Sequence, residues 1–277
     1  MNVDARVGVV STRGIGPERG GRVRNEDNYL VVAHGRARFL RDGVEHTMDT
    51  PGPGMMVVVA DGMGGHEHGA LASAAAVQAM ARLVRAGRPV DPDLALHGFV
   101  VRAHRQLQLR ARERGVGNMG TTLTVAWILG GRAHWVHVGD SRLWLVRDGA
   151  LRQLSRDHTR GEFAERDGRG PPVSPQALTQ NFIFGSRGLG DDDGIRVDAG
   201  MDTGTVPLQP GDRLLLTSDG VHGFLEARGI EAAVLSDPDP TKAARQVSEA
   251  SIAAGSDDNI TALVVSVDTV ETPSPVH

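Results

Sequence analysis

Cysteine is absent from this chain of 277 residues, and lysine is almost absent. The lack of cysteine excludes disulfides, zinc–thiolate sites and cysteine nucleophiles. Lys242 is the only lysine among 30 Lys and Arg residues. Its surroundings match none of the motifs that place a lysine in a phosphate-binding loop, a kinase strand or a Schiff base. Any metal site in this protein must therefore use donors other than sulfur, and oxygen is the main one available.

Long hydrophobic runs and a strong net charge are absent as well. No run approaches the roughly 18 apolar residues that span a bilayer. The first residues include Asp4 and Arg6 and no apolar segment long enough for a signal peptide. The net charge of -4 gives no reason to expect nucleic acid or a membrane surface as a partner. We therefore expect a cytoplasmic protein.

Hydrophobic periodicity predicts an alternation of strands and helices in ordinary globular proportions. Hydrophobic residues make up 40 % of the chain and charged residues 23 %, as is ordinary for a globular protein, and its length suits one large domain or two small ones. Apolar runs rich in β-branched residues predict strands at 6–11, 28–33, 56–61, 121–129, 132–138, 142–147, 195–199, 212–218 and 260–267. Helical spacing predicts helices at 68–86, 92–114, 159–166 and 240–253.

Short turns between the strands indicate how the sheet is built. Asp42-Gly43, Gly130-Gly131, Gly139-Asp140-Ser141 and Asp148-Gly149 all have the turn chemistry of antiparallel hairpins. We therefore predict an α+β protein of hairpins flanked by helices, with a single domain over 1–270 and a frayed tail over 271–277.

Two apolar runs end abruptly in Asp-Gly, at Asp61-Gly62 and at Asp219-Gly220. A carboxylate at the end of a buried strand is held rigidly, and the following glycine allows a turn or the close approach of a ligand. Taken singly, each Asp-Gly is more typical of a turn. Two of them at the ends of buried strands suggest carboxylates that converge on a shared hard cation.

Further acids lie next to the predicted strands. They are Glu26-Asp27 before the second strand, Asp140 between two strands, and Asp258 just before the last one. An oxygen-only donor set suits Mg²⁺ or Mn²⁺, with water completing the shell. Two such ions about 3.5–4 Å apart could clamp a phosphoryl group and supply a hydroxide for in-line attack.

The order of these motifs resembles that of the metal-dependent protein phosphatases (PPM, the type 2C serine/threonine phosphatases) in their compact bacterial form. The matching segments are Arg22-x-x-Asn25-Glu26-Asp27, Asp61-Gly62-Met63-Gly64-Gly65-His66, Gly120-Thr121-Thr122, Val138-Gly139-Asp140-Ser141-Arg142, Asp157-His158-Thr159, Gly211-Asp212-Arg213-Leu214-Leu215-Leu216-Thr217-Ser218-Asp219-Gly220 and Asp258-Asn259-Ile260-Thr261. The resemblance implies a four-layer α-β-β-α sandwich with two central antiparallel sheets flanked by helices.

The resemblance also implies a metal site of two, or with a weaker site three, Mn²⁺ or Mg²⁺ ions. Asp61 matches the ligand that bridges two ions, and Asp219 and Asp258 match ligands that complete the first site. The Glu26 side chain and the Gly62 carbonyl match the second site. Asp27 matches the residue that holds a water of the metal shell, and Asp140 with Asp219 matches the third site. Arg22 matches the phosphate-binding arginine. Arg24, close by, we expect to be a surface charge.

Two departures from the family pattern leave alternatives open. Some members carry a histidine directly after Asp-Gly as a general acid, and this chain has Met63 there. Either water of the metal shell or His66 then protonates the leaving group, although a structural role for His66 is the better expectation. His158 we expect to be a turn or capping residue.

The second departure lies between the domain's two halves. The Gly- and Pro-rich segment 168–184, with Phe182 and Phe184, is either a lid over the substrate or packing on the sheet. It is followed by Ser186-Arg187-Gly188-Leu189-Gly190, which stands where the family's usually longer segment ends, and Asp191-Asp192-Asp193 is expected to be a solvated turn.

The resemblance implies hydrolysis of phosphoserine or phosphothreonine on proteins, without a phosphoenzyme intermediate. It also implies a cognate bacterial Ser/Thr kinase as the opposing enzyme, and we expect a monomer. One alternative is a catalytically silent member that binds phosphoproteins. Another is a phosphatase dedicated to one regulator such as an anti-sigma antagonist.

Overall fold

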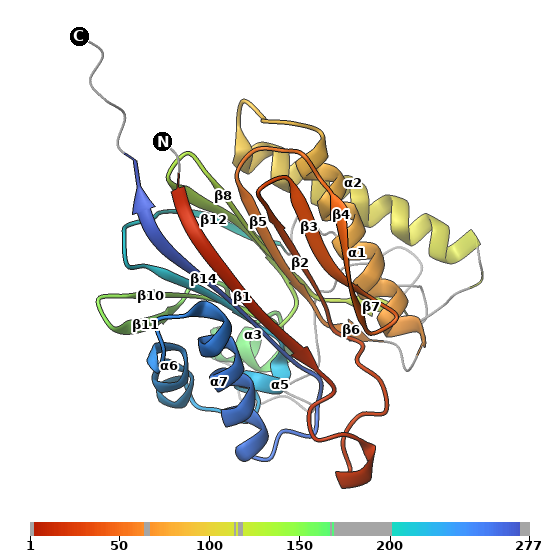
Figure 1. Ribbon diagram of the computed structural model, residues 1–277. Coiled ribbons are helices and arrows are strands. Elements are labelled where there is room, and N and C mark those ends of the chain that lie inside the picture. Colours follow the sequence, from red (N-terminus) through yellow and green to blue (C-terminus); the bar gives the residue numbers. More distant parts are fainter. Residues whose placement is uncertain are drawn as a thin grey trace.

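The computed structural model of the chain describes residues 3–63, 67–113, 115, 119–166, 168 and 201–271. Two large antiparallel sheets form its centre (Figure 1). The first has seven strands in the order β12 (Asp202–Pro207), β9 (Arg132–Val138), β8 (Leu123–Leu129), β5 (Met55–Ala60), β2 (Asn28–Ala33), β3 (Arg36–Arg41), β4 (Val44–Asp49). The second has five in the order β1 (Val3–Thr12), β14 (Ile260–Val270), β13 (Arg213–Thr217), β10 (Arg142–Arg147), β11 (Ala150–Gln153).

Helices cover the outer faces of both sheets (Figure 1). The helices α1 (Glu67–Arg85) and α2 (Pro92–Glu113) pack on the seven-stranded sheet, and α6 (Ala227–Leu235) and α7 (Pro240–Ala253) pack on the five-stranded sheet. The shorter elements are α3 (Arg160–Arg166), α5 (Asp219–His222), the 3₁₀ turn η1 (Pro17–Arg19), and the two-stranded pair β6 (Gly62–Met63) and β7 (Gly120–Thr121). The predicted α-β-β-α sandwich is confirmed.

Three apolar layers hold the sandwich together. They explain why the central strands are continuous apolar runs in the sequence. Along β2, Leu30 and Val32 face the helices α1 and α2, whereas Tyr29 and Val31 face the second sheet. Successive side chains of a strand point to opposite faces of its sheet. Since both faces of β2 and β5 are covered, every position of β5 is buried, and the strands need no polar alternation.

Four connections are two-residue hairpin turns in which both residues have positive φ. The sequence predicted three of them, at Asp42-Gly43 (φ 53° and 75°), Gly130-Gly131 (60° and 82°) and Asp148-Gly149 (53° and 76°). Such dihedrals belong to the type I′ turns that match the twist of a hairpin. The fourth, His34-Gly35 (51° and 76°), joins β2 to β3 and was not singled out from the sequence.

The segment Gly139-Asp140-Ser141 does not form the predicted hairpin. It carries the chain from β9, in the seven-stranded sheet, to β10, in the five-stranded sheet. Gly139 has a φ of 111°, but Asp140 is not among the residues with positive φ, so the turn lacks the type I′ geometry. Asp140 consequently lies at a crossing between the two sheets.

Several elements were not predicted, and several predictions fall outside the described residues. The strands β11 and β12 and the helices α5 and α6 are additional to the sequence prediction. The expected strand 195–199, most of the segment 168–184, Ser186 to Gly190, Asp191 to Asp193, His66 and the tail 272–277 lie outside the described residues.

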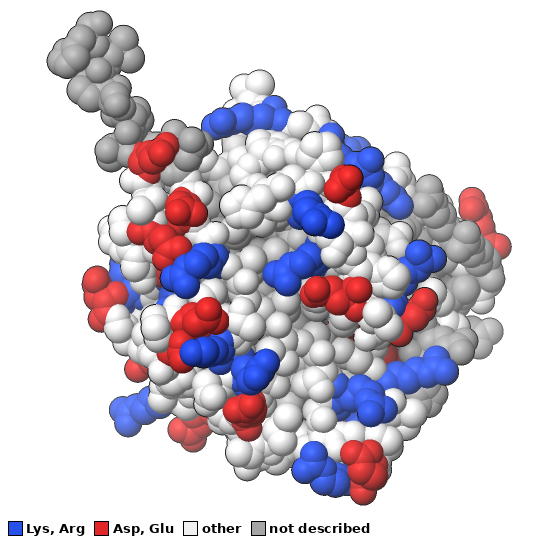
Figure 2. All heavy atoms as spheres, viewed as in Figure 1, with Lys and Arg blue, Asp and Glu red and all other residues white. Residues whose placement is uncertain are grey.

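Within the described part of the chain, no helix combines the length and apolar character needed to cross a membrane. Acidic and basic side chains are interspersed over the face that Figure 2 shows, with neither sign forming one continuous field.

Candidate active site

The main chain of Asp61 is held by two neighbouring threonines where β5 ends. The N–H of Asp61 donates to Thr122 Oγ1 at 2.9 Å, and the Asp61 carbonyl accepts from Thr121 Oγ1 at 2.8 Å and from the N–H of Thr122 at 2.9 Å. Thr122 Oγ1 also hydrogen-bonds Ser141 Oγ at 2.7 Å. The segment Gly120-Thr121-Thr122 therefore fixes Asp61 and links it to the crossing that carries Asp140.

Asn259 joins the loop that carries Glu26 to the segment that carries Asp258. Its Oδ1 accepts from the N–H of Glu26 at 2.8 Å, and its Nδ2 donates to the carbonyl of Arg24 at 2.9 Å. Beside it, Arg22 Nη2 donates to Asp258 Oδ2 at 2.7 Å. This ion pair raises the pKa of the Arg22 guanidinium. Residues 22–27 and 258–259, far apart in the chain, thus form one unit.

Asp27 is the most enclosed carboxyl in this unit, with an exposed fraction of 3 %. Its Oδ2 accepts from Ser218 Oγ at 2.8 Å and from Thr261 Oγ1 at 2.7 Å. Its Oδ1 is buried and has no hydrogen-bond partner. Burial raises the pKa of Asp27 to about 7, although the two hydroxyl donors oppose the shift. A buried carboxylate oxygen without a partner is costly unless a cation or water meets it.

The carboxyls of Asp61, Asp219 and Asp140 lie close enough to shift one another's titration. Burial and the charges of Asp27, Asp219 and Asp140 raise the pKa of Asp61 well above its usual value. Burial and the charge of Asp258 raise that of Asp219. Burial and Asp219 raise the pKa of Asp140 to about 7. The side chains of Asp61 and Asp219 interact directly, and this interaction raises the pKa of Asp61 and opposes the rise in that of Asp219.

Two glycines make room for this cluster. A Cβ on Gly62 would lie 2.2 Å from the carbonyl oxygen of Gly69 and 2.6 Å from that of Glu26. A Cβ on Gly69 would lie 2.0 Å from Glu26 Oε2. Helix α1 can approach the Glu26 carboxylate only because position 69 has no side chain. The sequence analysis gave Gly69 no role, since a glycine near a helix start carries no distinctive signal.

Two buried histidines hold the crossing that carries Asp140. His137 Nε2 donates to the Gly139 carbonyl at 2.9 Å, so its Nδ1 accepts from Thr124 Oγ1 at 2.9 Å. His158 Nδ1 accepts from the N–H of Gly139 at 3.2 Å, and the two rings lie 4.9 Å apart. The expectation that His158 is a turn or capping residue is wrong. The residue that caps α3 is Thr159, whose Oγ1 accepts from the N–H of Glu162.

A sequence profile of the family described as protein phosphatase 2C matches residues 39–250. That range is well over half of the chain. The chain belongs to the protein phosphatase 2C family.

Two curated relatives of this phosphatase family agree with the assignment. Protein phosphatase PhpP of Streptococcus pneumoniae is 33% identical over 234 residues, which cover 82% of this chain and 92% of that protein. Serine/threonine protein phosphatase PstP of Mycobacterium tuberculosis is 33% identical over 217 residues, or 76% of this chain and 40% of that longer protein.

Solved structures from the family share the fold. The M. tuberculosis phosphatase PstP/Ppp superposes with a TM-score of 0.74 at 26% identity, over 96% of this chain and 99% of that one. A PstP catalytic domain in complex with two manganese ions gives a TM-score of 0.73 at 27% identity, with the same coverage.

The donor set of this phosphatase chain suits a hard divalent cation. All predicted ligands are oxygens, namely the side chains of Glu26, Asp27, Asp61, Asp140, Asp219 and Asp258 and the carbonyl of Gly62. Within the described ranges, no three His, Asp or Glu side chains already surround one point as ligands. Arg22 is paired with Asp258, and Asp61 contacts Asp219. The excess of buried carboxyls over basic groups nevertheless calls for positive charge at this place.

Small polar residues are the part of the site to which sequence analysis gave no role. Asn25, Thr122, Ser218, Asn259 and Thr261 occur in the matched motifs, and each hydrogen-bonds a carboxyl or the backbone beside one. These residues are part of the motifs that the sequence shows. Their hydrogen-bond partners lie in other segments of the chain and could not be identified from the sequence.

Proposed function

We propose that this chain is a metal-dependent protein serine/threonine phosphatase. One observation carries the proposal: in a chain of the protein phosphatase 2C family, one buried carboxyl and three part-buried ones, from four separate segments, meet beside Arg22. A guanidinium next to a cation-binding carboxylate cluster is suited to hold a phosphate monoester. Its relatives PhpP and PstP are protein phosphatases by name.

We assign the metal ligands as the resemblance implies, with two Mn²⁺ or Mg²⁺ ions and a weaker third. Asp61 would be shared by the pair, Asp219 and Asp258 would hold one ion, and Glu26 with the Gly62 carbonyl would hold the other. Asp140 with Asp219 would hold the third. Bound ions of this kind supply a hydroxide at neutral pH and neutralise the phosphoryl oxygens. The manganese pair of the PstP catalytic domain supports this assignment.

The protein's own residues bind the phosphate and control one proton. Arg22 uses one nitrogen, Nη2, for Asp258 Oδ2, so its other N–H groups can donate to the substrate phosphate. Asp27 Oδ2 is already engaged by two hydroxyls, so the unpartnered Oδ1 is the atom that can accept a proton from the attacking water.

We further propose that the chain acts in the cytoplasm as a monomer and that a cognate Ser/Thr kinase phosphorylates its substrates. The kinase follows from the reaction, because a phosphoprotein phosphatase needs an enzyme that makes its substrate.

The decisive test is hydrolysis of p-nitrophenyl phosphate and of a phosphothreonine peptide with and without Mn²⁺. Wild-type protein is compared with Asp219→Asn and with the control Asp148→Asn, which removes the same charge in an exposed β10–β11 turn. Because Asn tolerates the positive φ of that turn, the control should fold normally. We expect at least a hundredfold loss in Asp219→Asn, in line with the loss of a group that stabilises a transition state, and none in Asp148→Asn.

Two results would contradict the proposal in different ways. Folded wild-type protein without metal-dependent turnover would point to the silent phosphoprotein-binding member instead. Equal activity in Asp219→Asn and wild type would leave the enzyme but refute the assignment of the site.

A further inference from the structure

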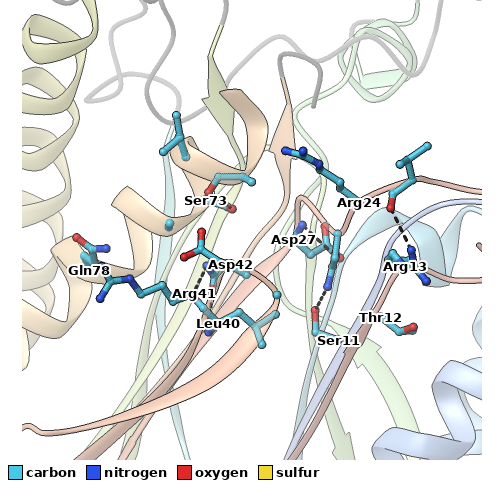
Figure 3. A pocket seen from close by; sticks show the side chains of 17 residues that line it. Ser11, Thr12, Arg13, Arg24, Asp27, Leu40, Arg41, Asp42, Ser73 and Gln78 are labelled. Atoms are coloured by element: carbon cyan, nitrogen blue, oxygen red, sulfur yellow. Dashed lines mark hydrogen bonds between the residues drawn. The ribbon is translucent and has the colours of Figure 1, made fainter. Parts of the chain in front are cut away.

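A groove of about 990 Å³ lies beside the carboxylate cluster, on the outer side of the loop that carries it. Its walls come from the end of β1 and the following loop, the turn between β3 and β4, and one face of α1 (Figure 3). The loop residue Asp27 lines its floor. The groove therefore borders the segment that carries the site, through Val23, Arg24, Asn25 and Asp27.

Three exposed arginines line the groove, namely Arg13, Arg24 and Arg41. Figure 3 shows Arg13 and Arg24 on one side of the groove and Arg41 on the other. Asp42 is the only exposed acidic residue in the lining. The expectation that Arg24 is merely a surface charge thus gives way to a place in a basic groove.

Several polar groups of the floor are already bound to one another. Ser73 Oγ donates to the Glu26 carbonyl at 2.7 Å, and Asn25 Nδ2 donates to Ser11 Oγ at 2.9 Å. Arg13 uses one nitrogen, Nη1, for the Val23 carbonyl at 3.2 Å. In the described part of the chain, neither Arg13 nor Arg41 forms an ion pair. Recognition in this groove must therefore come from the guanidinium groups.

Two large apolar side chains stand at the edge of the same groove. Val23 is 58% exposed and Leu71 of α1 is 56% exposed. Exposed apolar groups next to the exposed guanidinium groups of Arg13 and Arg41 suit a peptide segment with acidic side chains and an apolar one. The volume is at the upper end of the roughly 300–1,000 Å³ of small-molecule sites, which leaves room for a stretch of chain.

We infer that this groove binds an acidic segment of the phosphoprotein substrate, next to its phosphorylated residue. The inference rests on the proposed phosphatase function and assigns the class of substrate. A substrate phosphate at Arg22 would lie only two residues from Arg24, so the chain flanking the phosphoresidue can enter the groove directly. The carboxylates of this acidic segment then pair with Arg13, Arg24 and Arg41. Arg41 takes no part in binding the phosphate group.

Kinetic comparison of two phosphothreonine peptides tests this. One carries Glu residues beside the phosphothreonine, and the other carries Gln at the same places. We expect wild type to hydrolyse the Glu peptide with a roughly three- to tenfold higher kcat/KM, through a lower KM, as expected for a few exposed charge pairs. The preference should largely vanish at 0.5 M NaCl, where such pairs are screened.

Arg41→Gln is the variant to compare, and Arg36→Gln is its matched control. Both arginines are exposed residues of β3, at opposite ends of that strand, but only Arg41 lines the groove. Arg41→Gln should lose much of the preference for the Glu peptide while hydrolysing p-nitrophenyl phosphate like wild type. Arg36→Gln should keep both properties, and Arg13→Gln, on the other side of the groove, should resemble Arg41→Gln.

A binding measurement separates the groove from catalysis. Fluorescence anisotropy of a labelled, unphosphorylated Glu peptide should show weaker binding to Arg41→Gln than to wild type and Arg36→Gln. Equal binding by all three proteins, or equal kcat/KM for the two phosphopeptides, would overturn the inference while leaving the proposed function intact. Absence of all hydrolysis by the wild type would instead refute the proposed function.

Discussion

Single residues at the site show that space matters as much as charge. Gly62 and Gly69 pack so closely against each other that neither position has room for a Cβ atom. The Glu26 carboxylate lies against Gly69. Around the acids, hydroxyl and amide side chains fix the orientation of each carboxyl, as Ser218 and Thr261 do for Asp27. Such fixed dipoles are what a preorganised site needs before a charged ligand arrives.

Gly69→Ala should separate stability from activity. Alanine stabilises a helix over glycine by about 0.5–1 kcal/mol, but its Cβ would lie 2.0 Å from Glu26 Oε2. The carboxylate must move, so we expect a loss of Mn²⁺-dependent hydrolysis of about tenfold or more, as for a displaced ligand support.

Gly98→Ala in α2 is the control for that substitution. Its Cβ would meet only the flexible end of the Arg102 side chain, at 3.2 Å. It should gain stability without losing activity, as measured by urea unfolding and by hydrolysis of p-nitrophenyl phosphate. Full activity in Gly69→Ala would show that Glu26 does not depend on the space at position 69.

At the scale of elements, the crossing from β9 to β10 decides where Asp140 lies. A hairpin at Gly139-Asp140-Ser141 would have kept β9 and β10 in one sheet. Instead the crossing places Asp140 between the sheets, near Asp219. His137 and His158 hold both hydrogen-bonding groups of Gly139, so the position of the crossing depends on these two buried side chains.

His137→Gln should reveal this dependence through pH. Burial lowers the pKa of His137 to about 4, below about 6.5 for an unfolded histidine. The unfolded chain therefore binds more protons between these values, and the contribution of His137 to stability is lost as pH falls below 6.5. We expect the free-energy difference between wild type and His137→Gln to be about 1–2 kcal/mol larger at pH 7.5 than at pH 5.

Urea unfolding of both proteins in EDTA measures this difference. Without metal ions the carboxyl cluster titrates alike in wild type and variant, so its contribution cancels in the difference between their free energies of unfolding. A difference that is independent of pH would mean that His137 is not buried in its neutral form.

At the scale of the molecule, the sandwich assembles the site from segments that are remote in sequence. Strands of both sheets end at one edge of the interface between the sheets. Arg22 contacts Asp258 there, although the two residues are 236 positions apart in the sequence. A large apolar cluster packs between the two sheets. The price of this arrangement is a group of buried carboxyls that repel one another, so the folded state should gain stability from a divalent cation.

Mn²⁺ should therefore raise the unfolding temperature of the whole protein. A ligand that binds only the folded state contributes about 2.7 kcal/mol at a concentration of 100 times its Kd. Thermal unfolding with Mn²⁺ or EDTA should show a large rise for wild type and Asp148→Asn and a much smaller one for Asp219→Asn. An equal rise in all three would place the cation elsewhere.

The sequence alone determined most strands, the long helices, three hairpin turns and the carboxylates of the candidate site. These features depend on local patterns: apolar runs, helical spacing, Asp-Gly turns and ordered motifs. Strand β2 and helix α7 match their predicted ranges residue for residue.

Only the tertiary structure decided which strands pair and what surrounds each acid. The segment at Gly139 has the amino-acid composition of a hairpin turn although it is none. Strands that are buried on both faces have no sequence pattern that indicates to which sheet they belong. Contacts such as Asn259 with Glu26, or a groove lined by Arg13, Arg24 and Arg41, join segments that become neighbours only when the sheets stack. Long-range packing, which no local pattern encodes, therefore set the geometry of the site.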